Sequence, residues 1–231
     1  MNTLIDAFIN AVKLLFSFDA ALLQVVVLTL RVTGGALLLA IGIGLPIGVW
    51  LGLRERVPLA GCLLPLIYTG MGLPPVVVGL LVYLFLSNQG VLGDLQWLFT
   101  PTAMILAQTV IALPLVIGLT LTAVRAIPHS LRLQVRALGA TRTQLAWAVL
   151  MEARLGVLAA IIAAFGAIIS EVGAVMLVGG NIETQTRVLT TAIVLETRKG
   201  NFALALALGI ILLSLAFVAN FALYHLERRG E

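Results

Sequence analysis

The sequence contains very little charge. Only 10% of its 231 residues are Asp, Glu, Lys or Arg, whereas about 25% is usual in soluble globular proteins. Hydrophobic residues make up 61% of the chain, which is more apolar surface than a soluble fold of this length can hide. The few charges are clustered, and long uncharged stretches separate them, as several membrane spans require. The composition therefore excludes a soluble domain, a coiled coil and a disordered chain.

Cysteine and several enzyme motifs are also scarce or missing. Cys62 is the one cysteine and lies in an apolar run, so one chain has no disulfide framework and no cysteine-based metal site. The sequence has no Gly-x4-Gly-Lys-Ser/Thr loop, and any ATP-driven step therefore needs a separate subunit. It also has no His-Glu-x-x-His motif or paired-Asp cation site. We expect no catalytic residue, metal ligand or cofactor in this chain.

The gaps between the charges predict an all-α, polytopic membrane helix bundle. A helix needs about 20 mostly apolar residues to cross a bilayer, and five stretches qualify: residues 29–53, 57–86, 101–124, 156–178 and 202–226. Residues 1–19 combine helical apolar spacing with interrupting polar residues, which predicts an amphipathic helix on the outer interface. A sixth span there is the alternative. Residues 20–231 are predicted to form the transmembrane domain.

Small residues and prolines recur within the predicted spans. Gly44, Gly48 and Gly52 follow one another at four-residue spacing, which predicts a face where helix backbones approach closely. Five prolines are expected to interrupt helices inside the membrane, because proline leaves a backbone carbonyl without its partner. The interruptions are either broken helices or ordinary kinks in a structural bundle. They are Pro46, Pro65, Pro74, Pro75 and Pro114.

The distribution of cations predicts the orientation. Nine of the 14 Lys and Arg residues fall on one side of the five spans: Arg54, Arg56, Arg125, Arg132, Arg136, Arg142, Arg154, Arg228 and Arg229. Cytoplasmic loops carry the excess of Lys and Arg, so this side is predicted to be cytoplasmic and the N-terminus to lie outside. The net charge of +4 is thus interpreted as a sign of orientation and not of nucleic-acid binding.

Residues 125–155, on the cytoplasmic side, are predicted to form a helical hairpin. Pro128 and Ser130 can open a helix, and Gly139-Ala140-Thr141 can end it. The apolar face of this helix is predicted to consist of Leu131, Val135 and Leu138. A second helix is predicted to run from about Arg142 toward the fourth span. The hairpin would present arginines beyond the membrane.

Two motifs in this hairpin carry a family resemblance. They are Arg136-Ala-Leu-Gly-Ala-Thr-Arg142 and Arg154-Leu-Gly-Val157. They resemble the Gly-containing half and the later part of the cytoplasmic loop in the membrane-spanning permeases of ATP-binding-cassette importers. The Glu-Ala-Ala half of that loop is replaced by Leu133-Gln134-Val135. The resemblance implies a loop helix that docks on an ATPase subunit through Ser130, Leu131, Val135, Arg136, Ala137, Gly139, Ala140 and Arg142. The alternatives are an ordinary helix-capping role for Gly139 and solvated charges at Arg136 and Arg142.

Three further stretches are similar to one branch of these permeases. They are Gly72-Leu-Pro-Pro-Val-Val-Val-Gly79, residues 170–182, and Thr190-Thr-Ala-Ile-Val-Leu-Glu-Thr197. The first two look like molybdate and tungstate permeases, and the third looks most like tungstate permeases. The resemblance implies import of an oxyanion, tungstate before molybdate, across a prokaryotic cytoplasmic membrane. It also implies a second copy of the chain, an ATPase dimer that binds ATP and Mg, and an extracytoplasmic binding protein.

Polar residues in and beside the spans are the candidates for the translocation pathway. A carrier must release its anion, which favours hydroxyl and amide contacts over a cluster of arginines. The candidates are Thr69, Ser170, Glu171, Asn181 and Thr190. A lone carboxylate would repel an oxyanion, so we expect Glu171 to be structural or gating and to bond a cation or backbone amides near residues 179–181. Ordinary interhelical hydrogen bonding is the alternative for the others.

The sequence is also compatible with two other classes of function. An ion-coupled secondary transporter or channel should show buried charge relays and often internal repeats, and neither is evident in the sequence. A membrane-embedded enzyme should show convergent catalytic groups. A nucleotide-binding protein that co-purified with the chain would favour the importer over both.

Overall fold

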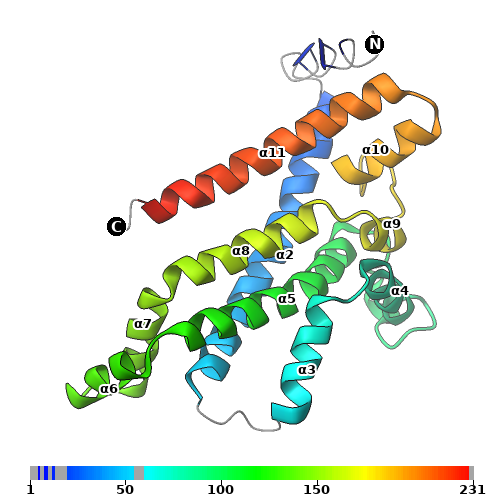
Figure 1. Cartoon of the computed structure of the whole chain (residues 1–231). Helices are drawn as coiled ribbons and strands as arrows, with labels where there is room; N and C mark the ends of the chain where they lie inside the picture. The colour runs from blue at the N-terminus through cyan, green and yellow to red at the C-terminus, as the bar shows by residue number, and fades with distance from the viewer. Residues whose placement is uncertain (1–4, 6–7, 10–11, 14–19, 55–59, 229–231) are drawn as a thin grey trace.

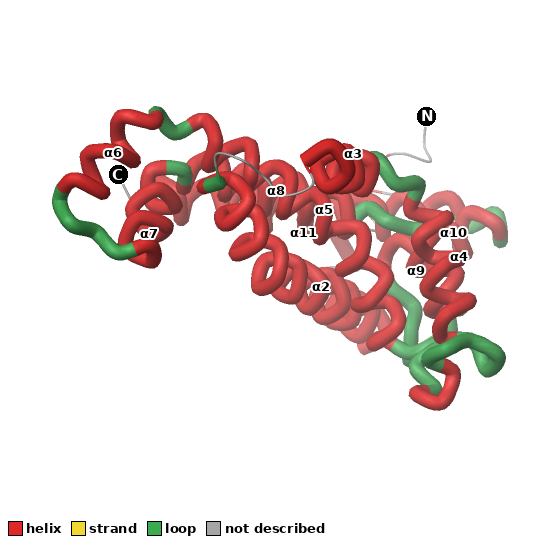
Figure 2. The backbone as a smooth tube through the Cα atoms, turned by 90° about the horizontal axis from the view of Figure 1, so that it is seen from below, coloured by secondary structure: helices red, strands yellow, loops and turns green. Residues whose placement is uncertain are grey.

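The computed structural model describes residues 5, 8–9, 12–13, 20–54 and 60–228. Over these ranges the regular secondary structure is entirely helical, which confirms the predicted all-α class (Figures 1 and 2). Local chemistry sets several helix ends. Pro75 and Pro101 occupy the first turns of α4 (Pro75–Leu86) and α5 (Pro101–Ala126), where the missing N–H of proline costs no hydrogen bond.

The centre of the molecule is the contact between α2 (Ala20–Leu53) and α5. The glycine face predicted on α2 packs against α5, as expected. A Cβ atom built on Gly48 would lie 2.8 Å from the Cβ of Thr120 and 2.9 Å from the carbonyl oxygen of Ile117. A Cβ atom on Gly52 would lie 2.6 Å from Val124. Only glycine allows the two helix backbones to come this close.

Helix α5 is surrounded on its other sides. It contacts α3 (Ala60–Met71), α4, α8 (Arg154–Ile169) and α9 (Gly173–Gly179) as well as α2. The largest buried cluster lies where these helices meet and includes Ala36, Val78, Met104, Ile168 and Val175. Helix α11 (Phe202–Arg228) packs on α10 (Leu189–Arg198) and on α8 (Figure 1). Many of the buried residues in this largest cluster are alanines, so the helices around α5 can pack closely.

Three helices of the described chain are long and apolar enough to cross a membrane: α2, α5 and residues 202–222 of α11. Two bent helix pairs pass the same test, α3 with α4 and α7 (Arg142–Glu152) with α8. Counting each pair as one span gives five, in agreement with the predicted number. Helix α2 has 34 residues and is about 51 Å long, so it is longer than the hydrocarbon core is thick.

Two predicted spans differ from the structure. The second, residues 57–86, is not one helix, because α3 and α4 meet at an angle of 103° around Gly72-Leu73-Pro74. The fourth, residues 156–178, is wrong in extent, because α8 ends at Ile169 and α9 begins only at Gly173. The two consecutive prolines explain the first break: neither can donate a backbone hydrogen bond back to α3.

Three of the five prolines do not break their helices, so the broken-helix alternative is wrong for them. Pro46, Pro65 and Pro114 lie inside the continuous helices α2, α3 and α5. A membrane helix tolerates a single proline where neighbouring helices satisfy the freed carbonyl.

Most of the N-terminal segment predicted to be interfacial lies outside the described residues. Ile5, Phe8, Ile9 and Val12 are described, and they are helical and exposed. The division of the chain into residues 1–19 and 20–231 therefore stays a prediction.

Candidate functional site

The predicted helical hairpin is present at one end of the molecule. Helix α6 (His129–Ala137) follows Pro128, and Gly139 takes a left-handed φ of +82° after the last turn. The N–H of Gly139 donates to the carbonyl of Arg136 at 3.0 Å. Thr141 then caps α7 by accepting from the N–H of Gln144, whose side chain bonds the N–H of Thr141 in return. The chain thus reverses direction through one glycine and one capping box.

The predicted docking residues occupy two faces of this hairpin. Leu131 and Val135 pack inward against a buried cluster that contains Val124, Leu145 and Val149. The outward face includes Ser130, Arg136, Ala137, Gly139 and Arg142. Ala140 is half-buried in the turn.

The prediction that Leu138 belongs to the apolar face of this helix is wrong. Its side chain is 88% exposed, because α6 ends at Ala137 and Leu138 lies in the turn that precedes Gly139. Leu133 is exposed as well, so the hairpin presents apolar side chains to its surroundings.

Arg132 is the hairpin residue that sequence analysis missed. One terminal nitrogen of its guanidinium donates to the carbonyl of Val124 at 2.6 Å, and the other donates to the carbonyl of Gly52 at 3.4 Å. These carbonyls belong to the C-terminal turns of α5 and α2, where the helix dipole favours a cation. Arg132 therefore fastens α6 to the ends of the two central helices. The sequence marks it only as one cytoplasmic cation among nine.

A second group of polar residues lies where α8 breaks. The hydroxyl of Ser170 donates to the carbonyl of Gly166 at 2.8 Å. The hydroxyl of Thr190 donates to the carbonyl of Glu171 at 3.1 Å. From α5, the side-chain amide of Gln108 donates to the carbonyl of Ile168 at 2.9 Å. Backbone groups released at the break are thus satisfied by side chains, as a membrane interior demands.

The carboxylate of Glu171 caps α9. Its Oε1 accepts a hydrogen bond from the N–H of Ala174 at 2.9 Å. The partner is a backbone amide, one of the two kinds expected, and not a cation, but the predicted location near residues 179–181 is wrong. The donor lies in the turn that immediately follows Glu171, because the helix restarts there with free N–H groups. The carboxylate thus satisfies one of the N–H groups at the start of α9.

Replacement of Glu171 tests whether its oxygen or its charge matters. Glu171→Ala removes the cap and is expected to cost about 1 kcal/mol, which corresponds to a fall in Tm of about 2–4 °C for a chain of this size. Glu171→Gln keeps an acceptor oxygen and is expected to stay close to the parent. Thermal unfolding of the purified protein measures both. Equal damage from Gln and Ala would instead mean that the negative charge is required.

The structure brings together only part of the predicted pathway set. Ser170, Glu171 and Thr190 are joined through the break between α8 and α9. Over the described ranges, no hydrogen bond links Thr69 or Asn181 to these three. Thr69 lies exposed near the end of α3, and Asn181 has a left-handed φ of +53° in the connection after α9.

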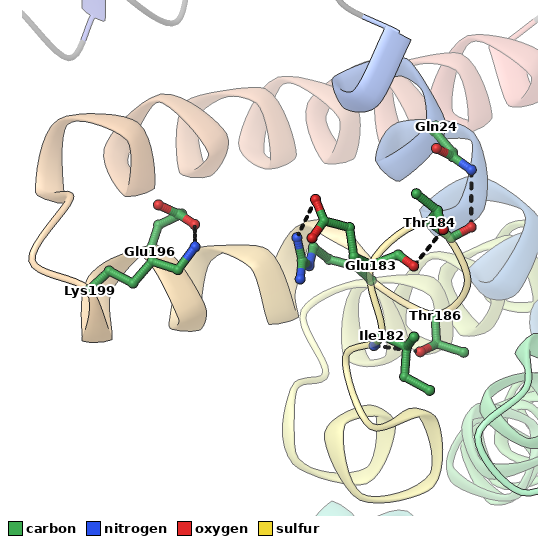
Figure 3. A network of polar contacts seen from close by, with 8 residues as sticks. Gln24, Ile182, Glu183, Thr184, Thr186, Glu196 and Lys199 are labelled. Atoms are coloured by element: carbon green, nitrogen blue, oxygen red, sulfur yellow. Dashed lines mark hydrogen bonds and ion pairs between the residues drawn. The ribbon is translucent and has the colours of Figure 1, made fainter.

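A polar network ties the connection between α9 and α10 to α2 (Figure 3). The side-chain amide of Gln24 donates to the carbonyl of Thr184 at 3.0 Å, and the hydroxyl of Thr186 accepts from the N–H of Ile182 at 2.9 Å. Thr29 of α2 accepts from the N–H of Leu189 at 3.0 Å, at the start of α10. This network and the hairpin lie at opposite ends of the molecule (Figures 1 and 2).

Glu196 holds the turn between α10 and α11. Its two carboxylate oxygens accept from Lys199 Nζ and from the side-chain amide of Asn201, each at 2.8 Å. Helix α10 is outside the five candidate spans. The hydrogen bond from Lys199, followed by that from Asn201, lowers the pKa of Glu196 below its ordinary value of 4.5.

The lowered pKa predicts a pH-dependent contribution to stability. A depressed folded-state pKa contributes stability above the unfolded pKa, and the contribution is lost as the pH falls through the folded pKa. The parent is therefore expected to exceed Glu196→Gln in Tm by the largest amount at about pH 7 and by a smaller amount at about pH 3.5. Glu183→Gln is the control, because Glu183 is 76% exposed in its 3.4 Å pair with Arg187 and such pairs contribute little. An equal pH effect in Glu183→Gln would show that the pH dependence does not come from the lowered pKa of Glu196.

Comparisons with known proteins converge on one family. The family model described as binding-protein-dependent transport system inner membrane component matches residues 44–230. A probable anion ABC transporter permease protein of Haloferax volcanii is 46% identical over 204 residues, covering 86% of this chain and 88% of the relative. The tungstate uptake system permease protein TupB of Peptoclostridium acidaminophilum is 35% identical over 227 residues, covering 98% and 99%.

A solved structure shares the fold. A chain of the MetNI methionine ABC transporter, in an inward-facing conformation, superimposes with a TM-score of 0.76 at 22% identity, covering 93% of this chain and 98% of that one. At this level of identity the likeness concerns the arrangement of the helices alone.

Proposed function

Because this chain belongs to the family of binding-protein-dependent transport system inner membrane components, we propose that it is the permease of an oxyanion importer, with tungstate as the favoured substrate and molybdate next. The observation that carries the proposal is similarity over the full length: 35% identity to a tungstate permease across 98% of the chain. The similarity to a probable anion permease supports the same class of substrate. As a family member, the chain is a multi-pass inner membrane protein without an ATPase site of its own.

The chemistry of the break between α8 and α9 supports an anion that passes without tight binding. Ser170 and Thr190 offer hydroxyl groups there, and the nearby carboxylate of Glu171 is occupied by a backbone N–H. Ser170 now donates to Gly166, so contact with an oxyanion requires its hydroxyl to rotate away from that carbonyl. We keep Thr69, Asn181 and Thr190 with Ser170 as proposed pathway contacts and Glu171 as a proposed structural or gating residue.

The proposal includes the partners that the sequence resemblance implies. Two copies of the chain would enclose the pathway, and an ATPase dimer, which binds ATP and Mg, would dock on the outward face of α6. Leu133 and Leu138 add exposed apolar area to that face. A binding protein outside the membrane would deliver the anion. Movement of α6 would reach the spans through Arg132, which bonds the ends of α2 and α5.

Gly139 provides a test of coupling through the hairpin. A Cβ atom at Gly139 would meet no described heavy atom within 4 Å, so the position requires glycine for its φ of +82° and not for space. Gly139→Val is expected to strain the turn by about 1–2 kcal/mol, and we expect transport per ATP hydrolysed to fall about tenfold. Gly139→Asn is the matched control, because asparagine tolerates the left-handed region. Reconstituted proteoliposomes give both rates. Equal loss in both variants would show that bulk, and not conformation, is at fault.

Metal accumulation in cells tests the substrate. Cells that lack this chain are expected to accumulate less tungsten than the parent strain at limiting tungstate, with molybdenum affected less, as measured by mass spectrometry. Re-expression of the chain should restore tungsten uptake. Equal accumulation of both metals in mutant and parent would overturn the oxyanion assignment, and selective loss of molybdenum would reverse the order of substrates.

A further inference from the structure

A groove of about 790 Å³ opens between the C-terminal half of α2 and α7. Leu45 and Val49 of α2 and Leu150 of α7 contribute to its mainly apolar wall. The groove lies at the same end of the molecule as the hairpin, and its volume falls in the range of small-molecule sites. None of the oxyanion pathway candidates lines it.

The charge in this groove has one sign. Arg54, Arg136 and Arg142 line it, and none of the described residues in its wall is Asp or Glu. The guanidinium carbon of Arg54 lies 3.9 Å from the centre of the Trp50 ring, so the cation is held over an aromatic face. The groove therefore presents a concentrated positive potential beside an apolar wall, which suits an amphipathic anion.

The order of these groups along α2 matches the order of groups in a phospholipid. Leu45 lies within a membrane-spanning helix, and Arg54 lies just beyond its end. Trp50 and Trp147 mark the boundary and are 48% and 63% exposed, as aromatic side chains at a membrane interface are. Acyl chains can continue along Ile43 and Ile47, which are exposed on α2. Headgroup and tails would thus meet the arginines and the apolar wall at the correct depths.

We propose that this groove binds one anionic phospholipid of the cytoplasmic leaflet. Its phosphate lies beside Arg54, which is outside the hairpin, and its acyl chains lie against α2. Arg136 and Arg142, which are proposed above as ATPase contacts, add positive charge on the hairpin side of the groove. Basic pockets between helices on the cytoplasmic side are suited to such headgroups, because they add charge attraction to apolar contact. The lipid would join α7 of the hairpin to α2 of the span, so its occupancy would make the position of the hairpin sensitive to membrane composition. This site is independent of which oxyanion is transported.

Native mass spectrometry of the full chain, purified with the subunits that accompany it, tests the proposal. The protein is delipidated and titrated with phosphatidylglycerol or with phosphatidylcholine of the same acyl chains. We expect tighter retention of phosphatidylglycerol. Arg54→Gln is expected to weaken it about fivefold, the change that one basic residue near an anionic lipid produces. Ala146→Phe fills the groove without changing charge and is expected to abolish the site.

Matched controls separate this site from its alternatives. Arg125→Gln removes an exposed cation at the same end that does not line the groove, and phosphatidylglycerol binding should be unchanged. Equal retention of the two lipids, equal loss in Arg125→Gln and Arg54→Gln, or displacement of the lipid by inorganic phosphate would overturn the proposal. Loss of a second copy of the chain or of the ATPase from the Ala146→Phe complex would also overturn it, because the groove would then be a protein interface.

Discussion

Gly48→Leu is expected to reduce strongly the fraction of the protein that folds in the membrane. A Cβ atom at this position meets Thr120 at 2.8 Å and the backbone oxygen of Ile117 at 2.9 Å. A side chain can rotate away, but the backbone of α5 cannot move without disturbing the core on its other side. Overpacking costs about 1–3 kcal/mol for added methylene groups, and leucine adds a whole branched side chain directly at the α2–α5 contact. We therefore expect an effect at or above the upper end of this range.

The same helix offers a matched control. Gly42 lies on the exposed face of α2, and a Cβ atom added to it would meet no described heavy atom within 4 Å. Gly42→Leu makes the same chemical change in the same membrane helix, so it should leave expression and Tm unchanged. Size-exclusion chromatography of the fluorescently tagged protein measures the folded fraction. Comparable loss in the two variants would show that leucine disturbs α2 itself and not its packing on α5.

Arg132→Met is expected to uncouple the hairpin from the spans while the spans stay folded. The change removes the hydrogen bonds to the carbonyls of Val124 and Gly52 and takes a cation away from two helix C-termini. A hydrogen bond from a charged group contributes about 1.5–3 kcal/mol, so we expect transport to fall about tenfold or more. Methionine retains much of the apolar stem, which limits the loss of packing.

Transport and ATP hydrolysis measured together in proteoliposomes identify the cause. Arg132→Lys should recover part of the activity, because an ammonium group can reach one of the two carbonyls. Arg125→Met changes the same charge at an exposed position of α5 and should behave as the parent does. Unchanged transport in Arg132→Met would refute the positioning role of Arg132. Equal loss in Arg125→Met would attribute the effect to net charge.

The hairpin shows which features can be predicted from a few neighbouring residues and which cannot. Gly139 and the residues around it predicted a turn between two helices, and both helices occur where expected, because caps and glycine conformations depend on a few neighbouring residues. Leu138 was misplaced because its environment depends on where the bundle lies. The prolines show the same limit: Pro74 and Pro75 coincide with a break, whereas Pro46 lies in a continuous helix.

Composition and spacing within single segments are enough to predict the class of the protein, the approximate number of spans, the cation-rich end and the glycine face of α2. Which polar groups meet depends instead on how the helices pack in three dimensions. Gln108 reaches a carbonyl 60 positions away, Arg132 reaches one 80 positions away, and Thr29 meets Leu189 across 160 positions. Such contacts satisfy backbone groups left open at helix ends, and their partners are set by how the helices pack. No local pattern contains that information.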